Sequence, residues 1–388
     1  MYITRPPMGC NTWNTFGADI NEKLIFELAD KMVEDGYKDA GYEYLVIDDC
    51  WSEKERDENG RLVPDKKKFP NGMKKVADYV HSKGLKFGMY TCAGVRTCAG
   101  YPGSYQHEFI DADTFKEWEV DFLKYDFCYF PDNGDTKTAY LTMSNALNTC
   151  GRDILFSACN WGYEDSWDWM RSIGAHMYRS TGDIFDNFIS FRDIALSQLK
   201  NINSSACGCY NDLDMLTVGM YGKGNVGFSH TCTDEEYKTH FALWCMLSSP
   251  LMIGCDIRKL NDYCKKLLKN EKLIKINADP AGRPPYIISK NNVYIMLKFL
   301  ADNEYALGIF NMSDDENEFK SAKDLIPLGY PVSSTVLLSD IGFPVYSDKK
   351  YELESVFTNE KTLIVSDSIM ANVKPHDCEV YIMKVSDK

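Results

Sequence analysis

Residues 123–130 read LKYDFCYF, and this dense run of apolar and aromatic side chains predicts a buried strand. Lys124 and Asp126 lie two residues apart within the run, and side chains at that spacing point to the same side of a strand. Burying a cation and a carboxylate together costs free energy unless both groups have partners. The stretch therefore predicts a polar site built onto an otherwise apolar strand.

Runs of the same kind recur along the first two thirds of the chain, where they alternate with helical patterns. The predicted strands are PMGCNTW (7–13), YEYLVIDDCW (42–51), LKFGMYT (85–91), DFLKYDF (121–127), DILFSAC (153–159), AHMYRSTGD (175–183), CYNDLDML (209–216) and PLMIGCD (250–256). Asn21 is a candidate N-cap for one of the helices, and Thr233 with Glu236 forms a candidate capping box for another. Alternating strands and helices in this number predict an α/β fold, a (β/α)8 TIM barrel, with an open doubly wound sheet as the alternative.

The character of the sequence changes after INADPAGRPP (276–285). Short β-rich runs follow, such as NVYIMLKFL and CEVYIMKV, separated by turn residues and with weak helical periodicity. These runs predict a C-terminal antiparallel β-sandwich. We therefore divide the chain into a (β/α)8 barrel domain, residues 1–278, and a β-sandwich domain, residues 279–388.

Composition limits the partners that the protein can bind. The formal net charge of −14 argues against nucleic acid and against an anionic membrane, because both require a basic surface. The 14 cysteines show no paired metal-ligand spacing, so we expect neither a metal nor another cofactor. The N-terminal MYITRPPMGCNTW does not resemble a signal peptide, which predicts a cytoplasmic protein, or a secreted one whose signal has been removed. The oligomeric state is left open.

Charged and aromatic residues gather at the ends of the predicted strands. In a (β/α)8 barrel, functional side chains lie at the C-terminal ends of the strands. The residues found there are Trp13, Asp48, Asp49, Tyr90, Lys124, Asp126, Asn160, Trp161, Arg179, Asp183, Asp212 and Asp214. Carboxylates, cations and aromatic rings together suit a sugar, and two carboxylates can split a glycosidic bond. The sequence therefore predicts a sugar site at one barrel mouth.

Several motifs carry a resemblance to a known family. RPPMGCNTWNTFG, YLVIDDCW, GRLVPDKKKFPNGMKKVADYVHSKGLKFGMYT, RTCAGYPGS, FLKYDFC, RSTGDI and NDLDML together resemble glycoside hydrolase family 27, the α-galactosidases and α-N-acetylgalactosaminidases of clan D. The resemblance implies a retaining exo-hydrolysis of terminal α-linked galactose, from oligosaccharides or glycoconjugates, through a covalent galactosyl-aspartate. It implies that Asp126 is the nucleophile and that Asp183 is the acid/base.

The resemblance also implies the sugar-binding residues. They are Trp13, Asp48, Asp49, Tyr90, Cys98, Lys124, Asn160, Trp161, Arg179 and Asp214. A disulfide between Cys98 and Cys128 is implied as well. Asn160 and Trp161, which lie beside the 2-substituent of the sugar, favour galactose. An α-N-acetylgalactosaminidase or β-L-arabinopyranosidase with the same pocket remains an alternative, as does a non-catalytic galactose-binding barrel.

Electrostatic arguments assign the roles of Asp126 and Asp183 less clearly than the family resemblance does. We expect Asp126 to stay ionised, since the nearby cation of Lys124 favours the charged form. A proton donor needs a raised pKa, which burial near another carboxylate can supply. Arg179 lies near Asp183 in the sequence and acts in the opposite direction. The role of Asp183 therefore depends mainly on the family resemblance.

Overall fold

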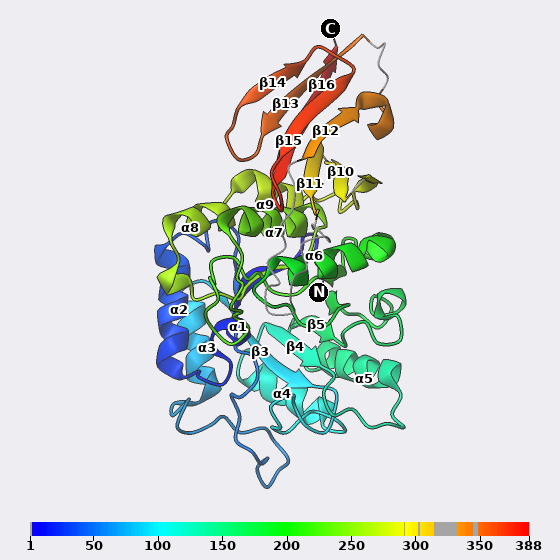
Figure 1. Cartoon of the computed structure of the whole chain (residues 1–388). Helices are drawn as coiled ribbons and strands as arrows, with labels where there is room; N and C mark the ends of the chain where they lie inside the picture. Colours follow the sequence, from blue (N-terminus) through cyan, green and yellow to red (C-terminus); the bar gives the residue numbers. More distant parts are fainter. Residues whose placement is uncertain (1, 291, 302, 314–331, 344–347, 388) are drawn as a thin grey trace.

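The computed structural model describes residues 2–290, 292–301, 303–313, 332–343 and 348–387 (Figure 1). Its first sheet contains eight parallel strands: β1 (Met8–Asn11), β2 (Tyr44–Val46), β3 (Lys86–Cys92), β4 (Phe122–Asp126), β5 (Leu155–Cys159), β6 (Met177–Arg179), β7 (Tyr210–Asp212) and β8 (Leu251–Ile253). Strand β1 pairs with both β2 and β8, and Leu216, just beyond β7, bridges to Ile253. The sheet therefore closes on itself, which confirms the predicted barrel and excludes the open sheet.

Helices lie between most of these strands around the barrel, and the connection from β5 to β6 contains the 3-10 helix Ser166–Asp168 instead of an α-helix (Figure 1). The α-helices are α1 (Trp13–Phe16), α2 (Glu22–Glu34), α3 (Gly72–Ser82), α4 (Glu108–Glu117), α5 (Thr136–Thr149), α6 (Phe188–Ser197), α7 (Asp234–Met246), α8 (Asp262–Leu268) and α9 (Glu271–Asn277). Asn21 accepts the N–H of Leu24 over 2.9 Å, and Thr233 with Glu236 forms a reciprocal capping box. Both predicted helix starts are confirmed.

Several strands are shorter than the apolar runs that predicted them. Strand β2 ends at Val46, although the apolar run continues to Trp51. Beyond Val46 the N–H of Asp48 donates to Oγ1 of Thr12, and the N–H of Asp49 donates to the Asp48 carboxylate. Because side chains and not a neighbouring strand satisfy these N–H groups, the strand ends and the two aspartates stand at the barrel mouth.

An apolar layer fills the barrel below that mouth. Its members come mainly from the starts of the strands: Tyr44, Val46, Phe122, Leu155, Met177, Met215 and Met252. A second layer of apolar side chains packs the barrel against its helices. The interior is thus a packed core, and the polar residues at the strand ends lie on top of it.

The C-terminal region consists of two antiparallel sheets. One has the order β14-β13-β16-β11-β10-β9 and the other pairs β12 with β15. The strands are β9 (Tyr286–Lys290), β10 (Val293–Phe299), β11 (Tyr305–Asn311), β12 (Val332–Leu337), β13 (Lys349–Ser355), β14 (Lys361–Ile364), β15 (Ser368–Val373) and β16 (Cys378–Asp387). Apolar side chains of both sheets, among them Leu307 and Ile369, pack into one core. The predicted β-sandwich is confirmed.

The six-stranded sheet lies against α7 of the barrel (Figure 1). Thr239 of α7 donates to the carbonyl of His376 over 2.7 Å, and the ring of His376 faces the Glu236 carboxylate. The residue predicted as the domain boundary, 278, falls between α9 and β9.

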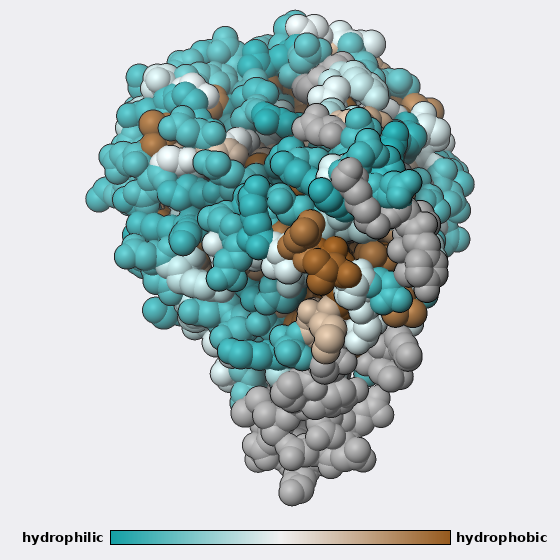
Figure 2. All heavy atoms as spheres, turned by 90° about the horizontal axis from the view of Figure 1, so that it is seen from above, coloured by the Kyte–Doolittle hydropathy of each residue, from teal (hydrophilic) through white to brown (hydrophobic). Residues whose placement is uncertain are grey.

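Hydrophilic side chains cover most of the face seen from above, and apolar side chains gather in one area of it (Figure 2). Among the described residues, no helix combines the length and the hydrophobicity that crossing a membrane requires.

Candidate active site

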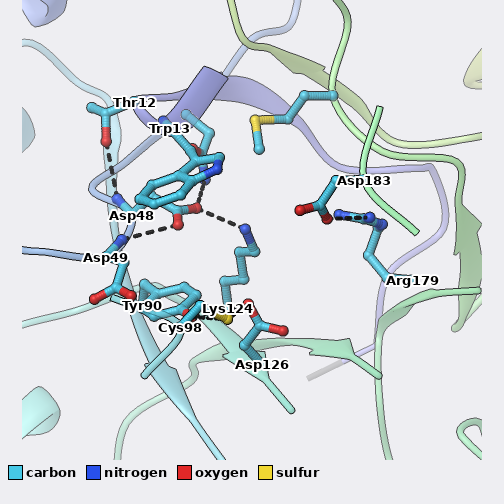
Figure 3. Close-up of polar contacts among 12 residues, drawn as sticks. Thr12, Trp13, Asp48, Asp49, Tyr90, Cys98, Lys124, Asp126, Arg179 and Asp183 are labelled. Atoms are coloured by element: carbon cyan, nitrogen blue, oxygen red, sulfur yellow. Dashed lines mark hydrogen bonds and ion pairs between the residues drawn. The ribbon is translucent and has the colours of Figure 1, made fainter. Parts of the chain in front are cut away.

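A pocket at the C-terminal end of the barrel strands gathers side chains from six of them and from the loops that follow. It is lined by Trp13, Asn14, Asp48, Asp49, Tyr90, Cys98, Lys124, Asp126, Arg179, Asp183, Asp214 and Met215. Every predicted site residue except Asn160 and Trp161 belongs to this lining. Figure 3 shows Lys124 between the Asp48 side of the pocket and Asp183 with Arg179.

Lys124 forms its ion pair with Asp48 and not with its neighbour in the motif. Its Nζ lies 2.8 Å from Oδ2 of Asp48, which also accepts a hydrogen bond from Asn11 over 2.7 Å. Burial acts to lower the pKa of Lys124, but the negative charges around it, that of Asp48 foremost and that of Asp126 among them, together outweigh burial and raise the pKa above its ordinary value. The pair therefore joins the ends of β2 and β4. The strand pattern predicted that Lys124 and Asp126 point to the same side, but the direct ion pair of Lys124 is with Asp48.

Asp126 is held in one orientation by two donors. The hydroxyl of Tyr90 donates to Oδ2 and the N–H of Phe127 donates to Oδ1, each over 2.9 Å. Burial raises the pKa of Asp126 above its ordinary value, although Lys124 and the two hydrogen bonds lower it. Lys124 acts on Asp126 in the expected direction, toward the charged form, but burial outweighs the nearby cation in the net shift of the pKa.

Asp49 ties down the loop that follows β3. Its carboxylate accepts hydrogen bonds from the hydroxyl of Thr97 over 2.8 Å, from the N–H of Ala99 over 2.9 Å and from the N–H of Cys50 over 2.6 Å. Between Thr97 and Ala99 lies Cys98, which lines the pocket and forms the implied disulfide with Cys128. Asp49 thus positions one wall of the pocket.

Arg179 is shared by two carboxylates on the other side of the pocket (Figure 3). Its Nη2 lies 3.0 Å from Asp183, and its Nη1 lies 2.9 Å from Asp214. The Asp214 carboxylate is buried and also accepts the N–H of Ile184 over 2.8 Å, whereas the side chain of Asp183 is 61% exposed. Burial acts to raise the pKa of Asp183, but the charges of Arg179 and Lys124 outweigh it and the pKa lies below its ordinary value.

Asp212 adds a carboxylate that sequence reasoning placed at a strand end but not in the site. It pairs with Arg179 across β6 and β7, and its Oδ1 accepts the N–H of Asp214 over 2.9 Å. Burial raises the pKa of Asp212 to about 6, against the opposing charge of Arg179. The half of the mouth formed by β6 and β7 therefore holds one arginine among three carboxylates.

Sequence reasoning missed Asn14 and Met215 among the lining residues. Each directly follows a predicted site residue, Trp13 and Asp214 respectively. Their positions next to strand-end residues could therefore have indicated that both residues line the pocket. Neither side chain ionises, so a search guided by charge passed over both.

Asn160 and Trp161 do not line the pocket. The buried carboxamide of Asn160 donates to the carbonyl of Tyr163 over 3.0 Å and accepts the N–H of Gly162 over 3.3 Å. Trp161 has a φ of 58° and points its ring toward Phe127, with the ring centroids 5.9 Å apart. The prediction places Asn160 at the sugar. In the structure its carboxamide is hydrogen-bonded within the turn, so the side chain does not reach the pocket.

The described residues bring one group of potential metal ligands together, namely Cys98, Asp126 and Cys128. The two sulfur atoms of this group are bonded to each other as a disulfide. A disulfide has no thiolate to offer, and thiolates are the form in which cysteines bind metals. This group therefore does not amount to a metal site.

The arrangement suits acid–base and nucleophilic chemistry on a polar ring. Asp126 and Asp183 line the same pocket, one buried and fixed, the other open to solvent. Lys124 and Arg179 supply donors for hydroxyl groups, and Trp13 supplies an aromatic wall (Figure 3). A pair of carboxylates in such a pocket can cleave a glycosidic bond.

Comparisons with known proteins agree with this chemistry. The family model described as alpha galactosidase A matches residues 5–279, which include every residue of the pocket. An α-galactosidase of Cyamopsis tetragonoloba is 40% identical over 381 residues, which cover 97% of this chain and 86% of that protein. The crystal structure of α-galactosidase I from Mortierella vinacea is 31% identical, with a TM-score of 0.89 and coverage of 100% of this chain and 98% of that one. A structure of the Saccharomyces cerevisiae α-galactosidase with raffinose is 26% identical, with a TM-score of 0.84 and coverage of 99% and 98%.

Proposed function

The chain belongs to the alpha galactosidase A family, within glycoside hydrolase family 27, and from this membership we propose how its pocket residues divide the work of hydrolysis. The protein is a glycoside hydrolase, an α-galactosidase that removes terminal α-linked D-galactose with the retention of configuration typical of the family. The alternative of a non-catalytic galactose-binding barrel is therefore set aside.

The observation that carries the division of roles is the contrast between two carboxylates of one pocket. Asp126 is 6% exposed and held by two donors, whereas Asp183 is 61% exposed and held by Arg179 alone among the contacts of the described residues. A nucleophile benefits from a fixed direction of attack. A proton donor must reach the leaving oxygen and then a water molecule. We therefore assign Asp126 as the nucleophile and Asp183 as the acid/base.

The reaction then proceeds in two displacements. A carboxylate oxygen of Asp126 forms a bond to C1 of galactose while the bond between C1 and the leaving oxygen breaks, and Asp183 gives its proton to that oxygen. In the second step Asp183 takes a proton from water, the water oxygen bonds to C1, and the ester bond to Asp126 breaks. Galactose leaves with the configuration of the substrate, and both carboxyl groups return to their starting state.

Charge changes during the cycle suit the double role of Asp183. In the unliganded pocket the charges of Arg179 and Lys124 hold the pKa of Asp183 low. A leaving group placed over the exposed Asp183 side chain removes water from it, and desolvation raises the pKa of a carboxyl group. Once Asp126 is esterified, its negative charge is gone and the pKa of Asp183 falls again. Asp183 therefore favours the acid form before the first step and the base form before the second.

The galactose ring is held by the opposite half of the pocket. Lys124 and Asp48 form a donor–acceptor pair that reaches an axial 4-hydroxyl, and Trp13 packs against the C–H face of the ring. An equatorial 4-hydroxyl would point away from this pair. The curated relative named α-galactosidase supports galactose over N-acetylgalactosamine and arabinose. Kinetics on the three 4-nitrophenyl glycosides tests this preference, and a best kcat/KM on the N-acetylgalactosamine compound would overturn it.

The roles are tested by trapping the intermediate. A 2-fluoro galactosyl substrate slows both steps, and we expect mass spectrometry to find the fluorogalactosyl adduct on the peptide that contains Asp126. Proton NMR of the first product from 4-nitrophenyl α-galactoside should show the α-anomer before mutarotation. An adduct on another carboxylate, or a first product in the β form, contradicts the assignment.

A further inference from the structure

Two phenylalanine side chains stand half-exposed close in the chain to the proton donor. Phe185 follows Asp183 by two residues and is 46% exposed, and Phe228, on the loop after β7, is 47% exposed. Their ring centroids are 6.1 Å apart and the ring planes are inclined by 65°, so the rings pack edge to face. We call this apolar surface, made of Phe185 and Phe228, the phenylalanine platform.

Hydrogen bonds beneath the platform fix its two halves to each other. Asp186 is fully buried next to Phe185, and it accepts the N–H of Gly222 over 2.7 Å and the hydroxyl of Thr231 over 2.6 Å. Gly222 and Thr231 bracket the loop that carries Phe228. The two rings are therefore presented by anchored segments, so that their exposure does not result from loose loop tips.

Aromatic residues also lie on the other flank of the acid/base. Trp161 and Tyr163 are exposed on the loop that follows β5. Gly162 between them packs so closely on the carbonyl of Ser180 that an added Cβ would lie 2.4 Å from its oxygen. Ser180 directly follows β6, and Asp183 comes three residues later. The loops on both sides of the Asp183 loop thus carry exposed aromatic rings.

The position of the leaving group during the reaction indicates which part of the substrate the phenylalanine platform contacts. The leaving oxygen must lie within hydrogen-bond reach of Asp183, and the pocket interior is closed by Lys124 and the apolar layer beneath it. The rest of the leaving group must therefore extend outward, past Asp183. Single exposed apolar side chains are ordinary on protein surfaces, but a packed pair anchored at this position matches the C–H face of a pyranose ring.

We propose that the phenylalanine platform binds the first sugar ring of the leaving group, and that the enzyme thereby favours galactose linked to another pyranose. This proposal rests on the role of Asp183 as proton donor. The platform adds no contact to the galactose itself. Its contribution therefore depends on the leaving group, being present for a sugar and absent for a methyl group.

The test compares two substrates that differ only in the leaving group, namely α-1,6-galactosylglucose and methyl α-galactoside. In the double variant Phe185→Ala/Phe228→Ala we expect the ratio of kcat/KM for the first over the second to fall about tenfold, as the loss of one aromatic contact surface predicts. Phe109→Ala is the matched control, because Phe109 is also a phenylalanine, 54% exposed, but lies on α4. Its ratio should equal that of the wild type.

A binding experiment covers the case in which turnover is too slow to measure. On the Asp126→Asn background, calorimetry should show that the two phenylalanine substitutions weaken galactosylglucose about tenfold and leave free galactose unchanged. Equal weakening of both ligands, or an unchanged ratio of kcat/KM, overturns the platform and leaves the catalytic roles intact. Wild-type protein that releases galactose from neither substrate overturns the proposed function, and the platform falls with it.

Discussion

The two halves of the barrel mouth are built in different ways. In the half formed by β1 to β4, Asp48, Asp49 and Asp126 each accept at least two hydrogen bonds or ion contacts from fixed donors. In the half formed by β6 and β7, Arg179 is shared between Asp183 and Asp214. The first half is buried and tied to the backbone, and the second leaves one carboxylate open to water.

The difference matches the two tasks of a retaining hydrolase. Recognition of a ring and attack on its C1 require groups that do not move, because small displacements slow the reaction. Proton transfer requires a group that exchanges with water between the two steps. We therefore read the β1–β4 half as the binding and attacking half, and the β6–β7 half as the proton-transferring half.

The largest effect should come from removing the nucleophile of the fixed half. Asp126→Asn keeps the shape of the side chain and an acceptor for Tyr90, but it cannot form the galactosyl ester. We expect kcat to fall by a factor of about 10⁴ or more, with a melting temperature within a few degrees of the wild type. Steady-state kinetics and a thermal melt check both parts. Turnover at the wild-type rate would remove Asp126 from the mechanism.

The open half should respond in a way that depends on the leaving group. In Asp183→Ala, cleavage of methyl α-galactoside should fall by about 10³-fold, because the methoxide needs a proton to depart. The first step with 4-nitrophenyl α-galactoside should fall far less, since nitrophenolate leaves without protonation. Pre-steady-state kinetics with the nitrophenyl substrate should then show a burst, because the second step has lost its base. Equal losses on both substrates would show that Asp183 acts by another route.

The ion pair of the fixed half offers the next test. Lys124→Met leaves the buried carboxylate of Asp48 without its cation, and breaking a buried pair in this way costs about 3–5 kcal/mol of unfolding free energy. The double variant Lys124→Met/Asp48→Asn removes both charges and should recover much of that loss. Urea unfolding at neutral pH measures all three proteins. If the single and double variants are equally stable, the two side chains are not coupled as the 2.8 Å contact indicates.

The sequence was sufficient to predict the barrel and the location of its polar mouth. Strand β4 spans Phe122–Asp126, close to the predicted 121–127, because period and hydrophobicity are local properties. The partner of Lys124 was not predictable in the same way. Whether its ammonium reaches Asp126 or Asp48 depends on how the ends of β2 and β4 face each other across the barrel, and local sequence does not contain that distance.

Two other features of the site also depend on more than local sequence. The sign of the Asp126 pKa shift depends on the balance of burial against a cation, and burial follows from the complete fold. Asn160 has the right position along the chain, but its carboxamide is used by the turn that ends at Tyr163. Residue type and spacing predicted which side chains approach the mouth, and tertiary packing decided which of them face the pocket.

The smallest predicted effect distinguishes two carboxylates within the open half by the pH dependence of stability. The raised pKa of Asp212, about 6, means that the folded state binds this proton more tightly than the unfolded state does, so stability is present at low pH and lost as pH rises through about 6. The contribution of Asp212 to the free energy of unfolding is at most about 3 kcal/mol, from a pKa shift of about two units.

For Asp183 the pKa is lowered, so its contribution to stability has the opposite sign and is lost as pH falls. Urea unfolding should show Asp212→Asn gaining on the wild type as pH rises from 4 to 7, and Asp183→Asn gaining as pH falls below about 4, where a carboxyl with a lowered pKa loses its contribution. Parallel curves for the two variants would mean that burial does not outweigh the nearby cations at Asp212 while yielding to them at Asp183, and the β6–β7 half would then lack the asymmetry that proton transfer requires.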